Sequence, residues 1–257
     1  MLEFKETYAE RKKEINNFIK LMKFLESKEM TKSKEDDSIS EFSRFFHKGT
    51  DEINGFDNDN KVSSIDFTYQ ELINILKSNV SLMIYNIIEF TVSGLMNCIY
   101  DEIKRNELSF IDVNESIRAL WKKTILKAAN DPNANFNTFL KKNDEIITKI
   151  LNNATLDIDP RNTMPGGNLD GESIRDTFKL HGINMVINPE NYRPNILRSI
   201  KEKRNELAHG AVSFIDAVRI DAISDIEENE KFVIAFLEEL IVTVEDFIAN
   251  EEYKYST

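Results

Sequence analysis

The sequence predicts a mostly α-helical protein. Only 8 of its 257 residues are glycine and 5 are proline, so few positions favour a break in a helix. Hydrophobic residues recur at intervals of three and four along most of the chain, which is the period of one helix face. No stretch alternates apolar and polar residues in the way that would indicate a dominant sheet.

The first predicted helix spans residues 3–27, with apolar side chains at helical spacing from Phe4 to Leu25. We expect it to pack on the body of the protein; a dimerisation or regulatory helix is the alternative. Residues 27–66 are polar and lack a period. The sequence therefore predicts an N-terminal region of one helix and an irregular linker, residues 1–66, followed by a helical domain, residues 67–257.

Two short stretches stand out within the linker. Residues 39–46 contain an apolar cluster, which we expect to dock as one helical turn. Asp57, Asp59 and Asn60 resemble part of a calcium-binding loop, but the glycine and the distal glutamate that such a loop needs do not follow them. We therefore expect no calcium site there.

The most apolar stretch predicts the central helix, with residues 69–77 running or kinking into residues 80–105. Its second part is apolar nearly all round, which is typical of a buried helix. Asn86, Glu89 and Asn97 interrupt it, which argues against a membrane span. Polar residues at helical spacing also form one stripe, which is either a solvent-exposed face or a polar support for another helix.

The remaining helices are predicted from their apolar spacing and their end signals. We expect helices at residues 114–129, 135–153 and 168–182, the last ending in His181-Gly182. His181 is interpreted as a capping and packing residue. Residues 183–194 are predicted to be irregular and residues 212–222 partly extended. A Ser-x-x-Glu capping box at Ser224 opens a final helix that continues to about residue 252.

The segment from Arg198 to Gly210 departs from its own pattern. It reads as the end of a helix that stops at Gly210, where glycine adopts a left-handed conformation easily. Arg204 falls within the apolar stripe, while Asn205 and His209 share a different face. An arginine at a core position needs a polar partner, and we expect Glu89 or Asn86 to supply it.

Composition excludes several kinds of function. A formal net charge of −12 excludes a general coating of nucleic acid, so nucleic acid has to bind at a local basic site. The histidines and the single Cys98 lack the spacing of metal ligands, and no phosphate-binding P-loop is present. We therefore expect no metal and no cofactor. The local candidates for RNA binding are Arg193, Arg198, Lys201 and Lys203.

Arg204-Asn205-Glu-Leu-Ala-His209-Gly210 resembles the Arg-polar-x₃-His motif of the HEPN superfamily of helical ribonucleases. The stretch Tyr85-Asn-Ile-Ile-Glu89 and the Gly-Gly-Asn-Leu-Asp segment before the motif look like the bacterial branch with RiboL-PSP-HEPN and MAE-like nucleases, which is linked to stress and phage defence. The resemblance covers residues 68–253. It implies an antiparallel helical bundle with an additional N-terminal helix and inserted helices.

The resemblance also implies a metal-independent endoribonuclease that acts as a homodimer, in which two motifs form one composite cleft. His209 would take the proton of a ribose 2′-OH, since the reference pKa of histidine is about 6.5. Arg204 would stabilise the charge on the phosphate, and Asn205 would orient the phosphate or the imidazole. Arg204 and His209 point about 140° apart on an ideal helix, which is a reason for two chains to be required.

A second function stays open, that of a non-catalytic helical interaction or regulatory module, which binds a nucleotide or a protein and acts as the partner of another nuclease. For the nuclease we expect an RNA substrate such as tRNA, a toxin or defence role, and an antitoxin or regulatory partner. The charged N-terminus is not that of a secretory signal, and a lone cysteine suits a reducing compartment, so we expect the cytoplasm and no membrane.

Overall fold

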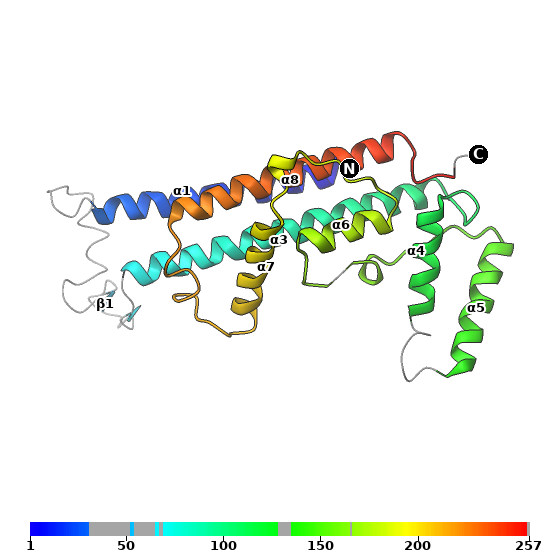
Figure 1. Cartoon of the computed structure of the whole chain (residues 1–257), viewed down its shortest axis with the longest axis horizontal. Helices are drawn as coiled ribbons and strands as arrows, with labels where there is room; N and C mark the ends of the chain where they lie inside the picture. The colour runs from blue at the N-terminus through cyan, green and yellow to red at the C-terminus, as the bar shows by residue number, and fades with distance from the viewer. Residues whose placement is uncertain (31–51, 54–64, 67–68, 128–134, 165, 256–257) are drawn as a thin grey trace, which may run out of the picture. The chain divides into compact units, whose positions relative to one another are not determined.

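The chain folds into α-helices in a computed structural model that describes residues 1–30, 52–53, 65–66, 69–127, 135–164 and 166–255. These residues form seven α-helices, two short 3-10 helices and one antiparallel pair of two-residue strands (Figure 1). The predicted all-α fold is confirmed. The cluster at residues 39–46 and the rejected calcium loop at residues 57–60 lie outside the described residues.

The elements are α1 (Leu2–Met30), β1 (Glu52–Ile53), β2 (Ile65–Asp66), α3 (Tyr69–Arg105), α4 (Glu115–Leu126), α5 (Phe136–Leu151), η2 (Pro160–Asn162), α6 (Gly171–Leu180), η3 (Pro189–Asn191), α7 (Pro194–Ala208) and α8 (Ile223–Ala249).

The chain divides into two compact units, and the division falls within its helices. Unit 1 comprises Met1–Ala9, Asn86–Lys201 and Phe232–Thr257, and unit 2 comprises Glu10–Tyr85 and Glu202–Lys231. The boundary expected between residues 66 and 67 lies beside residues that are not described, and it stays a prediction.

The helix α3 runs without interruption from Tyr69 to Arg105, so its two predicted parts form one helix. Many of its apolar side chains are buried, as its sequence predicts, among them Val80, Ile88, Leu95 and Ile103. Among the described residues, α3 alone is long and apolar enough to cross a membrane. Of its apolar 18-residue stretch, 56% is buried within the structure.

In unit 1, the first residues of α1 pack against the second half of α3. The ring of Phe4 lies so close to α3 that a Cβ atom added at Gly94 would approach the ring to 2.5 Å. Phe4 also stacks on Phe90, with 5.4 Å between the ring centroids. Gly94 is therefore required for this close approach, although it lies inside a helix where glycine costs stability.

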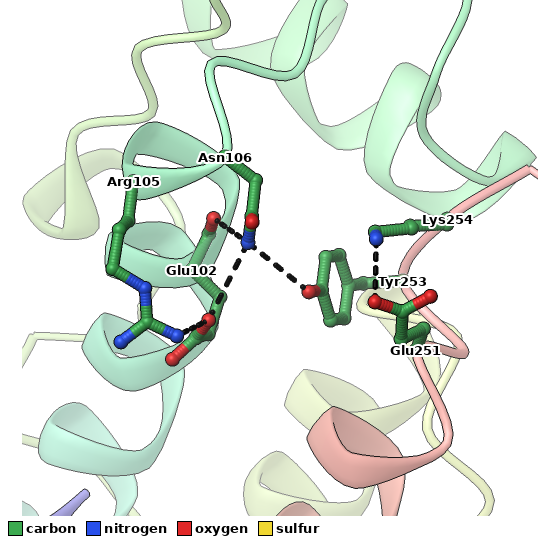
Figure 2. Close-up of polar contacts among 6 residues, drawn as sticks. All are labelled: Glu102, Arg105, Asn106, Glu251, Tyr253 and Lys254. Carbon is green, nitrogen blue, oxygen red and sulfur yellow. Dashed lines mark hydrogen bonds and ion pairs between the residues drawn. The ribbon is translucent and has the colours of Figure 1, made fainter.

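Within unit 1, the chain after α8 contacts the start of α4. Asn114 caps α4 by accepting a hydrogen bond from the backbone N–H of Ile117, and its side chain donates to the carbonyl oxygen of Glu252 at 2.7 Å. Its backbone N–H donates to the carbonyl oxygen of Tyr253 at 2.9 Å. Figure 2 shows the neighbouring contacts, in which Asn106 reaches both Glu102 and the hydroxyl of Tyr253. α4 also contacts α5 and α6.

Two local predictions are wrong. Helix α8 begins at Ile223, so Ser224 is inside the helix rather than its cap, and the carboxylate of Asp225 accepts a hydrogen bond from the backbone N–H of Ala222. Residues 214–220 form successive turns rather than an extended segment. The side chains of Lys77 and Ser78 on α3 donate hydrogen bonds to the carbonyl oxygens of Asp221 and Phe214. This segment is therefore held against α3 within unit 2.

Candidate functional site

The end of α7 in unit 2 carries the motif that the sequence singles out. Gly210 has a φ of 67°, in the left-handed region, and its N–H donates to the carbonyl oxygen of Leu207. The N–H of Ala211 donates to the carbonyl oxygen of Glu206 at 2.9 Å. These two bonds form a Schellman motif, in which the glycine reverses the chain and satisfies the last carbonyl groups of the helix. The predicted stop at Gly210 is confirmed.

Arg204 is half-buried and packs on an aromatic ring. Its Cζ atom lies 4.9 Å from the ring centroid of Tyr85, a residue of α3 that is fully buried. Its Nη1 atom donates to the Oδ1 atom of Asn205 at 2.9 Å. A cation over a ring is stabilised by the negative ring face, and a hydrogen bond to the amide fixes the direction of the guanidinium. These two contacts hold the arginine in place.

His209 follows the last residue of α7 and is exposed to solvent. Its backbone N–H donates to the carbonyl oxygen of Asn205 at 3.0 Å, one turn earlier. The structure therefore places Arg204, Asn205 and His209 at the same helix end, with the arginine anchored and the imidazole open to solvent. An exposed imidazole at the end of a rigid helix has access to a substrate.

The expected support of Arg204 by Glu89 or Asn86 stays a prediction. Those two residues belong to unit 1, while Arg204 and Asn205 belong to unit 2. Sequence reasoning missed Tyr85, which contacts Arg204 within unit 2. Tyr85 precedes Asn86 directly and lies in the stretch that carries the family resemblance, but its apolar surroundings made it look like a core residue.

Two of the four candidate RNA-binding cations have carboxylate partners in the chain. Lys201 bonds to Asp170 at 2.7 Å, and Lys203 pairs with Asp221. Burial alone would raise the pKa of Asp170, but hydrogen bonds from Lys201 and from Ser173 lower it to about 2. Arg193 and Arg198, the other two candidates, are exposed to solvent. The guanidinium of Arg193 also lies 5.7 Å from the ring centroid of Phe232.

His181 is fully buried at the C-cap of α6, which confirms its capping and packing role. Its Nδ1 atom lies 2.6 Å from the carbonyl oxygen of Thr177, and its Nε2 atom is hydrogen-bonded to the hydroxyl of Tyr100. Burial lowers the pKa of His181 to about 4, against the hydrogen bond to Thr177, which favours the protonated ring. Burial likewise raises the pKa of Tyr100. His181 is therefore a neutral core residue at neutral pH.

Within the described part of the chain, no group of three or more His, Cys, Asp and Glu side chains is placed to hold a metal ion. The sulfur of Cys98 is buried, and burial raises the pKa of its thiol.

An all-helical chain that carries an arginine, an amide and an exposed histidine at one helix end has the features of a HEPN protein. The chain belongs to the MAE_28990-like HEPN family, whose model matches residues 3–253. No curated protein and no solved structure gives a match. The family match includes α1, whereas the resemblance noted in the sequence begins only at residue 68.

Proposed function

We propose that this chain is an endoribonuclease of the HEPN type that cleaves RNA without a metal ion. The observation that carries the proposal is the end of α7, where Arg204 is anchored on Tyr85 and Asn205 and the exposed His209 follows one turn later. Family membership supports it, since many HEPN domains are ribonucleases.

The chemistry assigns one step to each side chain. The imidazole of His209 takes the proton of the ribose 2′-OH, and the 2′ oxygen attacks the adjacent phosphorus. The bond from phosphorus to the 5′ oxygen breaks, which leaves a 2′,3′-cyclic phosphate and, after proton transfer to the leaving oxygen, a 5′-OH end. Arg204 stabilises the additional negative charge on the phosphate oxygens during the attack. Asn205 keeps the guanidinium aligned, with Asn86 and Glu89 as further supports.

The direct test is to incubate the full chain with tRNA and with total RNA in the presence of EDTA. We expect cleavage that EDTA does not inhibit, with products that carry 2′,3′-cyclic phosphate and 5′-OH ends. Products with 5′-phosphate ends, or cleavage that EDTA abolishes, would contradict the proposed chemistry.

We further propose that two chains form one composite site. Arg204 and His209 are five residues apart at the end of α7, so their side chains point in different directions. Co-expression of an Arg204→Ala chain with a His209→Ala chain tests this arrangement. If each Arg204–His209 pair takes its arginine from one chain and its histidine from the other, the mixture regains about a quarter of wild-type activity, because about half of its dimers are mixed and each mixed dimer keeps one intact pair of two. If each chain uses its own pair, the mixture stays inactive.

A second candidate is a non-catalytic helical module, such as a regulatory partner of another nuclease. The net charge of −12 and the internal ion pairs of Lys201 and Lys203 favour it, because they reduce the cationic surface that RNA needs. This candidate predicts that the purified protein cuts no RNA and co-purifies with a partner protein. The nuclease, by contrast, predicts cleavage in the cytoplasm that an antitoxin or regulatory partner restrains.

A further inference from the structure

A cavity of about 440 Å³ lies in unit 1, and none of the residues assigned to the nuclease is among the described residues that line it. It is formed by α6 and by the segment from residue 183 to residue 192. Ligand-binding pockets commonly have volumes of about 300–1,000 Å³, so this one suits a small molecule of the size of one nucleotide.

The polar wall of the cavity is cationic. Arg175 and Lys179 both line it, and they are one turn apart on α6, so they share one helix face. None of the described residues that line the cavity is acidic. In a chain with a net charge of −12, two adjacent cations without an acidic neighbour in the cavity wall select for an anion.

The rest of the cavity lining is largely apolar and aromatic. Ile183 and Ile187 contribute alkyl groups, and Tyr192 contributes its ring. The guanidinium of Arg175 lies 4.7 Å from the ring centroid of Tyr192, so the cationic and aromatic walls meet at this pair. Asn184 also lines the cavity, and its amide both donates and accepts hydrogen bonds. A ligand that fits these walls has a planar heteroaromatic part beside its charge.

The cavity is held open by contacts from outside its walls. Both carboxylate oxygens of Glu239 on α8 are occupied, since Oε2 accepts from the backbone N–H of Asn188 at 2.7 Å and Oε1 accepts from the amide of Asn191 at 2.6 Å. The hydroxyl of Tyr192 donates to the carbonyl oxygen of Gly171 at 3.1 Å. The segment from residue 183 to residue 192 is therefore fixed on both sides of the 3-10 helix η3. The cavity is formed before a ligand binds.

We propose that this cavity binds a phosphorylated nucleoside, with the phosphate at Arg175 and Lys179 and the base against Tyr192 and the isoleucines. A long acyl chain would exceed the volume and would leave the amide of Asn184 unused. The same chemistry is offered by a free nucleotide and by one nucleotide of an RNA strand. The proposal does not depend on the nuclease assignment, because none of these residues belongs to the Arg204–His209 helix end.

The test is isothermal titration calorimetry of the full chain with each of the four nucleoside monophosphates, with inorganic phosphate and with a 2′-O-methyl oligoribonucleotide that 2′-OH chemistry does not cleave. We expect saturable binding by a free nucleotide or by the oligonucleotide, weakened about tenfold or more by Lys179→Glu. Arg105→Glu is the matched control, because Arg105 is an exposed cation of unit 1 that does not line the cavity and its replacement changes the net charge equally.

Binding of a free nucleotide identifies a small-molecule site, and binding of the oligonucleotide alone identifies a contact for an RNA strand. Both support the proposal when Lys179→Glu weakens them and Arg105→Glu does not. Absence of binding by every nucleotide and by the oligonucleotide overturns it. It is also overturned if Lys179→Glu and Arg105→Glu weaken binding equally, or if inorganic phosphate binds as tightly as the nucleotides.

Discussion

Helices α6 and α7 end in the same way and carry chemically different histidines. Each ends in the pair His-Gly, with a histidine directly after the last helical residue and a glycine of positive φ, 76° at Gly182 and 67° at Gly210. The backbone hydrogen bonds also match. In α6 the N–H groups of Gly182 and Ile183 donate to the carbonyl oxygens of Lys179 and Phe178, and in α7 those of Gly210 and Ala211 donate to Leu207 and Glu206.

The two histidines differ in what surrounds them. His181 is fully buried and both of its ring nitrogens are hydrogen-bonded, so its ring is closed to any substrate. His209 is exposed and directly follows the helix that holds Arg204. The local sequence therefore determines where each helix stops, and the packing around the stop determines whether the histidine is buried in the core or exposed to solvent.

The two histidines are expected to differ most in how their replacement affects RNA cleavage. Replacement of the general base in the proposed mechanism, His209→Ala, is expected to lower the RNA cleavage rate by about 10²- to 10⁴-fold. The exposed position predicts a change in the free energy of unfolding within about 0.5 kcal/mol. Rates from single-turnover cleavage and urea denaturation measure the two effects. Glu206→Ala, an exposed change on the same helix, is the control and should leave the rate unchanged; equal rates for both variants would remove His209 from the mechanism.

The buried histidine should show the opposite effect. His181→Ala leaves a cavity in the core of unit 1 and removes one of the two hydrogen-bond partners of the Tyr100 hydroxyl, which keeps Thr163, so we expect a loss of about 3 kcal/mol in the free energy of unfolding. Urea denaturation measures it. The cleavage rate of the fraction that stays folded should equal that of the wild type. A loss below about 1 kcal/mol would mean that the core around His181 adjusts without cost.

Most of the fold was predictable because it depends on local signals. Helical periodicity located all seven described α-helices, and the glycines after His181 and His209 marked two of the stops. The start of α8 was missed because the residue before the helix, Ala222, has no capping side chain. Asp225 in the first turn accepts a hydrogen bond from the backbone N–H of Ala222, whereas the Ser-x-x-Glu pattern predicts the cap at Ser224.

The candidate site was predictable only in part. Arg204 is conspicuous in the sequence because a charge interrupts an apolar stripe. Its contact with Tyr85 depends on the packing of two helices that are far apart in the chain, and a tyrosine within an apolar helix gives no sign of it. The ion pairs of Lys201 and Lys203 are equally invisible, because Asp170 and Asp221 are distant in sequence.

Titration of His181 should make stability depend on pH. Its pKa is about 4 in the folded chain and 6.5 when unfolded, so the unfolded state binds more protons between these values. The contribution to stability is therefore complete above pH 6.5 and is lost as the pH falls toward 4. Between pH 7 and pH 5 we expect a loss of about 2 kcal/mol in the free energy of unfolding.

Denaturation curves of the wild type and of His181→Gln across this range isolate the effect, because the variant lacks the titrating ring. The variant should have a flatter profile between pH 7 and pH 5. Parallel profiles for the two proteins would show that other groups cause the acid sensitivity.

The smallest expected difference is between the two glycines, which share a backbone conformation but not an environment. A Cβ atom at Gly210 would meet nothing within 4 Å, so Gly210→Ala costs only the left-handed conformation, about 1 kcal/mol. At Gly182 a Cβ atom would approach the Cβ atom of Ser116 on α4 to 2.9 Å. Gly182→Ala should therefore lose about 1 kcal/mol more in the free energy of unfolding, measured by urea denaturation.

The double variant Gly182→Ala with Ser116→Gly removes the close contact and should bring the loss back to that of Gly210→Ala, apart from the cost of a glycine within α4. If the second change restores nothing, the contact with α4 does not limit residue 182, and conformation alone explains both glycines.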